Sequence, residues 1–170
     1  MKRTQVAALA VAAVVVVAGK EFYRTASAAD LRWILAPTAH VANWLGCGHF
    51  TFDARLGYVD RELGFAIAPP CAGLHFALAA FVALVIGWLG AMHDWSSTAR
   101  HLAAAAALAY LATFVINTIR IVIAIRMHRM SGLDLADREQ LHRLEGIVVY
   151  LGGLCALYAL ARRHHAVARS

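Results

Sequence analysis

Four long apolar runs, separated by polar stretches, dominate the hydropathy pattern of the sequence. A helix needs about 20 residues to cross the roughly 30 Å hydrocarbon core of a membrane, so runs of this kind predict crossings. The last run is short for a crossing but long enough to be a plausible one. The runs extend over Val6 to Gly19, Ala72 to Met92, Leu102 to Ile125 and Gly146 to Ala161.

The first run has an alternative interpretation as a signal peptide. Lys2 and Arg3 precede it, and the small residues Ala26 to Ala28 offer a cleavage site. A charged stretch separates that site from the apolar run. An uncleaved first membrane helix is therefore the preferred interpretation.

The segment Leu31 to Gly46 is moderately apolar but shorter than a crossing helix. Pro37 interrupts it, and Trp33 and Trp44 lie near its ends, where aromatic side chains suit a membrane interface. The length favours a re-entrant or surface-lying helix, and the sequence leaves a full crossing open.

Residues His49 to Pro70 are mixed in character and alternate partially between apolar and polar side chains. With Gly57 and Gly64 as breaks, this pattern predicts two short strands or an ordered loop outside the bilayer. Pro69 and Pro70 then mark the start of the next helix.

Composition supports a chain that is embedded in a membrane over most of its length. Apolar residues make up 61% of it and the mean hydropathy is +0.62, well above a typical soluble domain. We therefore predict an all-α integral membrane protein with four to five transmembrane helices and a short extracytoplasmic strand-like or ordered loop before Cys71. Residues 1–170 should form a single membrane-embedded domain.

Charge and cysteine content exclude several classes of function. The formal charge of +6 comes from basic residues scattered around the apolar runs, without the basic face that nucleic acid binding needs. Cys47, Cys71 and Cys155 contain no C-x-x-C pair and no paired zinc-ligand spacing. We expect no nucleic acid partner, no disulfide framework and no metal site.

Three unusual residues should lie at the same face of the membrane. Cys71 begins one crossing, Arg120 lies late in the next, and His142 just precedes the third. Because the chain reverses direction at each crossing, an entry, a late exit and a second entry all fall on one side. Arg120 lies about 27 Å beyond the start of its run, near the far edge of the hydrocarbon.

Arg120 calls for an explanation because an arginine within an apolar helix costs about 2.5 kcal/mol or more near the centre of the membrane. Such a residue usually faces a polar partner or a water-filled cavity. The alternative is snorkelling, in which the side chain reaches the headgroups, with Asn117 three residues earlier as a local partner.

Cys71 is a candidate nucleophile. A thiol in the first turn of a helix meets unpaired backbone N–H groups and the positive end of the helix dipole, which favour the thiolate. A nearby arginine adds to this effect. Buried cysteines also act as small apolar residues, and that inert interpretation is preferred for Cys47 and Cys155.

Two histidines compete for the role of general acid and base. A histidine at the depth of a cysteine thiol can take its proton and later protonate a leaving amine. His142, in the sequence HRLEG, lies at that depth, whereas His75 follows Cys71 by four residues and starts a turn deeper in the membrane. His142 is the preferred candidate and His75 remains its rival.

The motifs PPCAGL, NTIRI and HRLEG resemble those of the exosortase and archaeosortase family of membrane transpeptidases. That family has a Cys in a C-[SA]-G context, a later Arg, and a final His or Arg. The resemblance covers about Cys71 to Leu160. The chain is shorter than typical members and lacks several amino-terminal crossings, so it is similar to compact subfamilies such as exosortase K.

The resemblance implies a cysteine-type protein-sorting protease or transpeptidase. Cys71 would be the nucleophile, Arg120 the stabiliser of the oxyanion or substrate, and His142 the general acid and base, with Asn117 supporting them. The substrate would be an exported protein whose carboxy-terminal sorting signal has a Pro-Glu-Pro-like motif, an apolar helix and basic residues. Neither a metal nor an organic cofactor is required.

The resemblance also implies a multi-pass protein of the bacterial inner membrane with its active site on the extracytoplasmic face. Arg162 and Arg163 would then end the last helix inside, as the positive-inside rule prefers. Against this orientation, four arginines would lie outside: Arg126, Arg129, Arg138 and Arg143. Two alternatives from other classes stay open. They are a non-enzymatic membrane scaffold or assembly factor, and a small transporter that uses Arg120 as an anion site.

Overall fold

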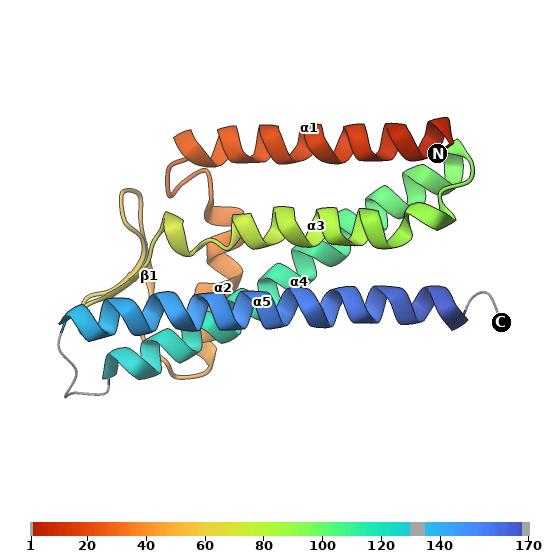
Figure 1. The fold of residues 1–170 in the computed structure, drawn as a ribbon. Coiled ribbons are helices and arrows are strands. Elements are labelled where there is room, and N and C mark those ends of the chain that lie inside the picture. The colour runs from red at the N-terminus through yellow and green to blue at the C-terminus, as the bar shows by residue number, and fades with distance from the viewer. Residues whose placement is uncertain (1, 130–134, 168–170) are drawn as a thin grey trace. The chain divides into compact units, whose positions relative to one another are not determined.

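The structure is a computed structural model that describes the backbone of residues 2–129 and 135–167 and the side chains of residues 2–129 and 144–160. It divides into two compact units. Figure 1 shows the helices and strands along the chain. The first unit comprises Met1–Arg24, Leu74–Thr113 and Gly152–Ser170, and the second comprises Thr25–Gly73 and Phe114–Leu151. Their helices are α1 (Arg3–Thr25), α2 (Arg32–Trp44), α3 (Leu74–Trp88), α4 (Trp95–Arg129) and α5 (Leu135–Val167), with 3₁₀ turns η1 (Pro69–Cys71) and η2 (Leu89–Ala91).

The predicted crossings are confirmed as helices, and with them the all-α membrane fold class. In the described part of the chain, three segments are long and apolar enough to cross a membrane: Arg3–Thr25, Pro69–Ala91 and Trp95–Arg129. Leu144–Leu160 is a shorter apolar helix. The 13 residues of α2 extend over only about 20 Å, which favours the surface-lying or re-entrant interpretation of that segment.

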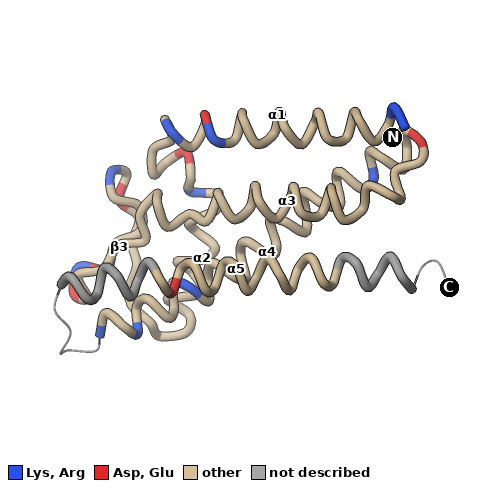
Figure 2. Tube along the Cα trace, viewed as in Figure 1, with Lys and Arg blue, Asp and Glu red and all other residues tan. Residues whose placement is uncertain are grey.

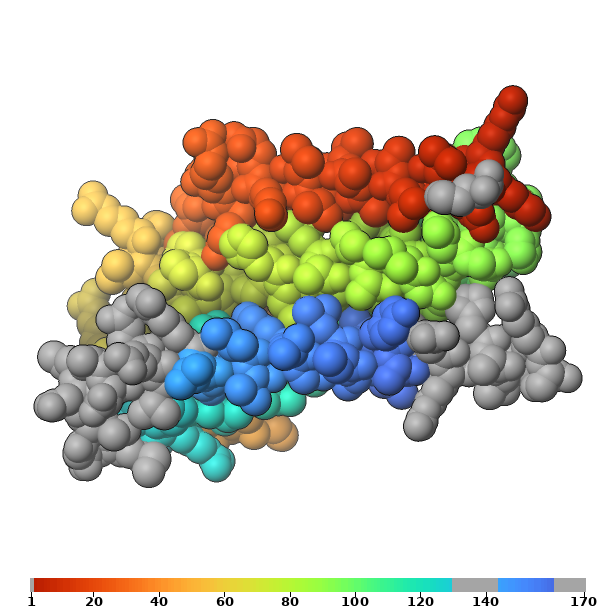
Figure 3. Space-filling view, viewed as in Figure 1, coloured from red at the N-terminus to blue at the C-terminus, as the bar shows by residue number. Residues whose placement is uncertain are grey.

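In the first unit, α1 and α3 pack side by side in opposite directions (Figures 1 and 3). The start of α1 meets the end of α3, where the Thr4 hydroxyl donates to the Met92 carbonyl at 3.1 Å. Near its other end, Gly19 lies so close to α3 that an added Cβ would be 2.8 Å from the Leu78 side chain. Figure 2 shows long uncharged stretches along both helices, as a lipid environment requires.

The fourth helix starts earlier than the sequence suggested. The apolar run that predicts this helix begins at Leu102, with the polar stretch His93 to Arg100 before it, but α4 begins at Trp95. The Asp94 carboxylate accepts from the Ser97 N–H at 2.8 Å, a cap that satisfies one of the free donors of the first turn. A capped helix tolerates polar residues at its start, so α4 is longer than its apolar run.

In the second unit, a three-stranded antiparallel sheet replaces the two strands expected between His49 and Pro70. Strands β1 (Thr51–Asp53), β2 (Gly57–Asp60) and β3 (Phe65–Ile67) pair in the order β1-β2-β3. Gly57 and Gly64 have positive φ angles of 98° and 66°. They mark the turns between strands, because glycine adopts this conformation without strain.

Asp60 organises the loops of this sheet. Its buried carboxylate accepts hydrogen bonds from the backbone N–H groups of His49 at 2.6 Å, Glu62 at 3.0 Å and Leu63 at 2.9 Å. The N–H of Leu63, followed by that of His49, lowers the pKa of Asp60, so the carboxylate stays charged at neutral pH.

The last turn of α4 is anchored to the same loops. His128 donates from Nε2 to the Leu63 carbonyl at 3.1 Å, and Arg129 donates to the Cys47 carbonyl at 2.7 Å. Arg129 therefore has a structural role on the side of the membrane where the sheet lies. Together, Asp60 and these two side chains hold the sheet, and the η1 turn that follows it, next to α4.

Candidate active site

Cys71 lies at the end of the η1 turn, outside α3. Its N–H donates to the Ala68 carbonyl at 2.8 Å, and Gly73, with φ of 72°, separates the turn from the start of α3 at Leu74. The expectation that Cys71 occupies the first turn of a helix, with the helix dipole favouring its thiolate, is therefore wrong. The left-handed glycine is the reason, because it interrupts the helical hydrogen bonds. The Cys71 side chain is half-buried.

Asn117 connects α4 to the Cys71 turn. Its amide, 1% exposed, donates from Nδ2 to the Cys71 carbonyl at 2.8 Å. Its Oδ1 accepts from the Tyr150 hydroxyl at 2.7 Å. The two sides of one buried amide thus join η1, α4 and α5 within the second unit.

Arg120, one turn after Asn117 on α4, has polar partners inside the second unit. Its guanidinium donates from Nη1 to the Tyr150 hydroxyl at 3.3 Å and lies 5.2 Å from the centre of the Tyr150 ring. Glu145 on α5 attracts it electrostatically. These contacts favour the polar-partner explanation of Arg120 over simple snorkelling.

Gly146 gives the guanidinium the room it needs beside α5. A Cβ at this position would lie 3.1 Å from Nε of Arg120 and 3.5 Å from Nη2. A larger residue there would require the Arg120 side chain to shift by at least a few tenths of an ångström. This contact gives the glycine of HRLEG a steric function.

We refer to Cys71, Asn117, Arg120, Glu145 and Tyr150 as the Cys71 site. Hydrogen bonds join Asn117 to the Cys71 carbonyl and join the Tyr150 hydroxyl to Asn117 and Arg120. Tyr150 and Glu145 were not proposed from the sequence. Both lie at the start of the last apolar run, at the face where the parity of the crossings places Cys71. A search of that stretch for charged side chains would have found Glu145, whereas the sequence carries no such signal for Tyr150.

Comparison with known proteins bears on the chain as a whole. The family model described as transmembrane exosortase (Exosortase_EpsH) matches residues 1–159. This chain belongs to the exosortase family. No curated protein and no solved structure matches it.

The exosortase match extends well beyond the motifs quoted from the sequence. Those motifs begin at Cys71, whereas the family match includes α1, α2 and the sheet. At the level of the family, the chain is a membrane protease or transpeptidase with several membrane-spanning helices. Its subfamily stays a prediction, as does the single domain over residues 1–170.

The general acid and base of this exosortase is not identified by the structure. His142 lies inside α5, which begins at Leu135, and not just before the helix as expected. The helix continues through the polar residues before the apolar run, because polar residues other than Gly and Pro do not interrupt helical backbone bonds. The His142 side chain lies outside the described residues, so its role stays a prediction.

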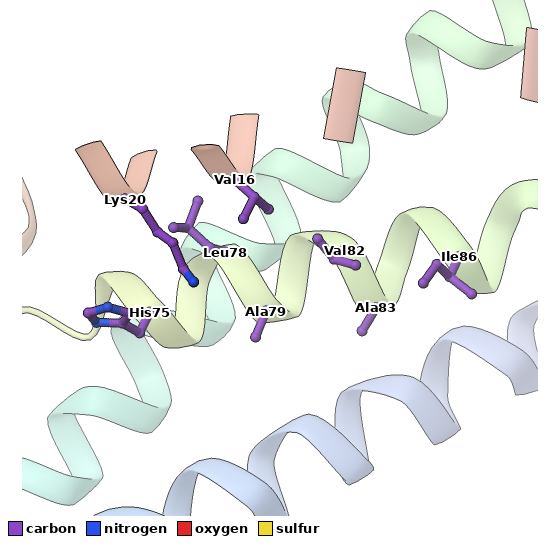
Figure 4. Close-up of a pocket in the computed structure, with 8 residues that line it drawn as sticks. All are labelled: Val16, Lys20, His75, Leu78, Ala79, Val82, Ala83 and Ile86. Atoms are coloured by element: carbon purple, nitrogen blue, oxygen red, sulfur yellow. The ribbon is translucent and has the colours of Figure 1, made fainter. Parts of the chain in front are cut away.

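His75, the rival of His142, lies in the first unit on α3. Its ring meets the ring of Tyr23 on α1 edge-on, with 4.9 Å between the centroids. Together with Lys20 it lines one end of a largely apolar pocket of about 430 Å³ between α1 and α3 (Figure 4). The His75 ring thus contacts α1.

The other cysteines have different surroundings from Cys71. Cys47 is buried and Cys155 is exposed on α5, and all three are free thiols. In the described residues, no cluster of three or more His, Cys, Asp or Glu side chains is arranged to hold a metal ion.

Substitution of Gly146 by alanine should lower exosortase activity by at least about tenfold, because a misplaced catalytic group is costly. The added methyl group would displace the Arg120 guanidinium, although alanine itself favours the helix. Cleavage of a sorting-signal substrate measures the effect. Gly152→Ala is the matched control, since an added Cβ there has no neighbour within 4 Å. Equal activity of the two variants would argue against a steric role for Gly146.

Proposed function

We propose that this exosortase cleaves the carboxy-terminal sorting signal of exported proteins through a thioacyl intermediate on Cys71. The signal would contain a Pro-Glu-Pro-like motif followed by a transmembrane helix, and the product would be transferred to a surface or lipid acceptor. The observation that carries the proposal is the bond from Asn117 to the Cys71 carbonyl, one turn from Arg120. It brings a thiol and a guanidinium into one polar site of a membrane protein.

The first half of the reaction forms the thioacyl enzyme. The Cys71 thiolate attacks the carbonyl carbon of the scissile peptide bond, and the carbonyl π electrons move to the oxygen. Arg120 stabilises the resulting oxyanion. As the oxyanion collapses, the C–N bond breaks, and the leaving amine takes a proton from His142 as the general acid. A thioester on Cys71 and a free carboxy-terminal fragment result.

The second half releases the product. An acceptor amine, or water, attacks the thioester carbon while His142 takes its proton, and the sulfur leaves as the Cys71 thiolate. Arg120 again stabilises the oxyanion. The enzyme returns to its starting state without a net redox change.

The proposed active face is extracytoplasmic. With the amino terminus inside and α2 not crossing, α1 brings the chain outside, and the sheet and Cys71 follow there. The chain then returns through α3 and crosses again through α4, so Arg120 near the end of α4 lies outside as well. The basic pair Arg162 and Arg163 falls inside.

Thiol labelling tests this orientation. In a chain with Cys47→Ser and Cys155→Ser, a membrane-impermeant maleimide should label Cys71 in intact spheroplasts. Cys71 is half-buried and free, so the reagent has access to it from the outside. Labelling that occurs only after the spheroplasts are lysed would place Cys71 in the cytoplasm.

Co-expression with a protein that carries a sorting signal tests the function. The exosortase should shorten this precursor, and mass spectrometry should find a new carboxy terminus within or next to the Pro-Glu-Pro-like motif. A precursor whose motif is scrambled, with the transmembrane helix kept, is the matched control. A scaffold would leave both precursors intact, and that result would overturn the proposal.

A further inference from the structure

The hydrogen bonds of the Cys71 site run in a single direction. Arginine has only donors, so the Tyr150 hydroxyl must accept at its oxygen from Arg120. The hydroxyl proton is then free for Asn117, which accepts it at Oδ1. The Asn117 amide nitrogen faces the Cys71 carbonyl, a group that can only accept.

This series of hydrogen bonds begins at the Arg120 guanidinium and ends at the Cys71 carbonyl, and these two groups determine the donor and acceptor at each bond between them. A guanidinium at one end and a backbone carbonyl at the other leave one orientation for the Tyr150 hydroxyl and one for the Asn117 amide. If the hydroxyl were absent, neither end would change, but the amide would lose the donor that holds its Oδ1. The guanidinium would lose an acceptor, while its contact with the ring would stay.

We propose that Tyr150 is a positioning residue, which orients Arg120 and Asn117 so that the guanidinium and the Cys71 turn keep a fixed relation. The proposal rests on the proposed function, in which Cys71 and Arg120 act together. The loss of the Tyr150 hydroxyl should matter because Asn117 is buried. An amide that is 1% exposed has few water molecules nearby that could replace a lost hydrogen-bond partner.

Replacing Tyr150 by phenylalanine separates the hydroxyl from the ring. The ring still packs beside Arg120, whereas the bonds to Asn117 and Arg120 are lost. We expect kcat for cleavage to fall by about tenfold with a smaller change in KM, because the lost interaction orients the oxyanion stabiliser. Tyr158→Phe is the matched control, on the same helix but 40% exposed and outside the Cys71 site.

A double-mutant cycle with Arg120→Gln distinguishes positioning from general stability. It is measured as the rate of Cys71 alkylation in the Cys47→Ser, Cys155→Ser chain, so it does not depend on a substrate. Tyr150→Phe should slow alkylation at neutral pH, since the Cys71 turn and the guanidinium are then no longer held in a fixed relation. In the Arg120→Gln background the same substitution should have little further effect.

A second variant, Asn117→Asp, keeps the proposal testable if Tyr150→Phe does not fold. Asn117→Asp keeps the shape of the side chain but removes the donor to the Cys71 carbonyl, and it should slow alkylation as well. The proposal is overturned if both variants match Tyr158→Phe, or if the effects of Tyr150→Phe and Arg120→Gln simply multiply. Failure of the proposed function has another signature, namely a wild-type chain that cleaves no sorting signal while the coupling persists.

Discussion

Replacing Cys71 by alanine is expected to abolish cleavage of a co-expressed sorting-signal protein, a loss of at least about 10³-fold. The thioester cannot form once the sulfur of Cys71 is removed. The backbone carbonyl that Asn117 binds is still present in the variant, so the η1 turn should keep its place. Immunoblotting for the precursor and its shortened product measures the result.

Two control variants make this result specific. Cys71→Ser keeps the size of the side chain but offers a much weaker nucleophile, and it should also be inactive. Cys155→Ala alters an exposed cysteine on α5 and should cleave normally. Normal cleavage by Cys71→Ala together with loss in Cys155→Ala would show that the nucleophile has been misassigned.

Replacing Arg120 by glutamine is expected to lower kcat/KM by about 10²- to 10³-fold, the usual cost of removing one oxyanion stabiliser. Lysine at this position should recover only part of the activity. Its ammonium is a point charge on a flexible stem, and it cannot contact the Tyr150 hydroxyl and a substrate oxygen with the planar geometry of a guanidinium.

The Arg120 substitution needs a control for stability, because it leaves the Glu145 carboxylate without the attraction of that charge. Glu145→Gln in the same chain removes the unbalanced charge. The double variant should recover thermal stability in detergent and remain inactive. Recovery of cleavage in the double variant would show that Arg120 serves the fold and not the reaction.

The crossings and their order follow from the sequence because lipid imposes a simple rule. Every backbone polar group in hydrocarbon must be bonded within a helix, so long apolar runs can be interpreted with little doubt about their structure. Parity then predicts that Cys71 and Arg120 share a membrane face. The bond from Asn117 to the Cys71 carbonyl agrees with that expectation.

The sequence predicts secondary structure less well for the segments outside the hydrocarbon core. The strands of the sheet have three or four residues each, so the partial alternation in this stretch does not fix their number. Their turns depend on Gly57 and Gly64. The true start of α4 depends on the cap that Asp94 provides. Polar residues at a helix end and in a loop look alike in a sequence, and this similarity also hid the start of α5.

The role of Tyr150 could not be predicted from the sequence, for a different reason. An aromatic residue in an apolar run is ordinarily interpreted as lipid-facing or packed in the core, and its sequence neighbours give no reason to expect more. Its function becomes visible only when Asn117 and Arg120 converge on its hydroxyl. Polar side chains that meet across helices are not encoded by the periodicity of any one of them.

The central claim is that Cys71 carries the acyl group, and the most direct measurement is mass spectrometry of the enzyme trapped during turnover. The purified exosortase is mixed with a sorting-signal substrate, quenched in acid and digested. The account predicts a substrate fragment attached to the peptide that contains Cys71, released by hydroxylamine as a thioester should be. An adduct on the Cys47 or Cys155 peptide, or continued cleavage without any adduct, would contradict it.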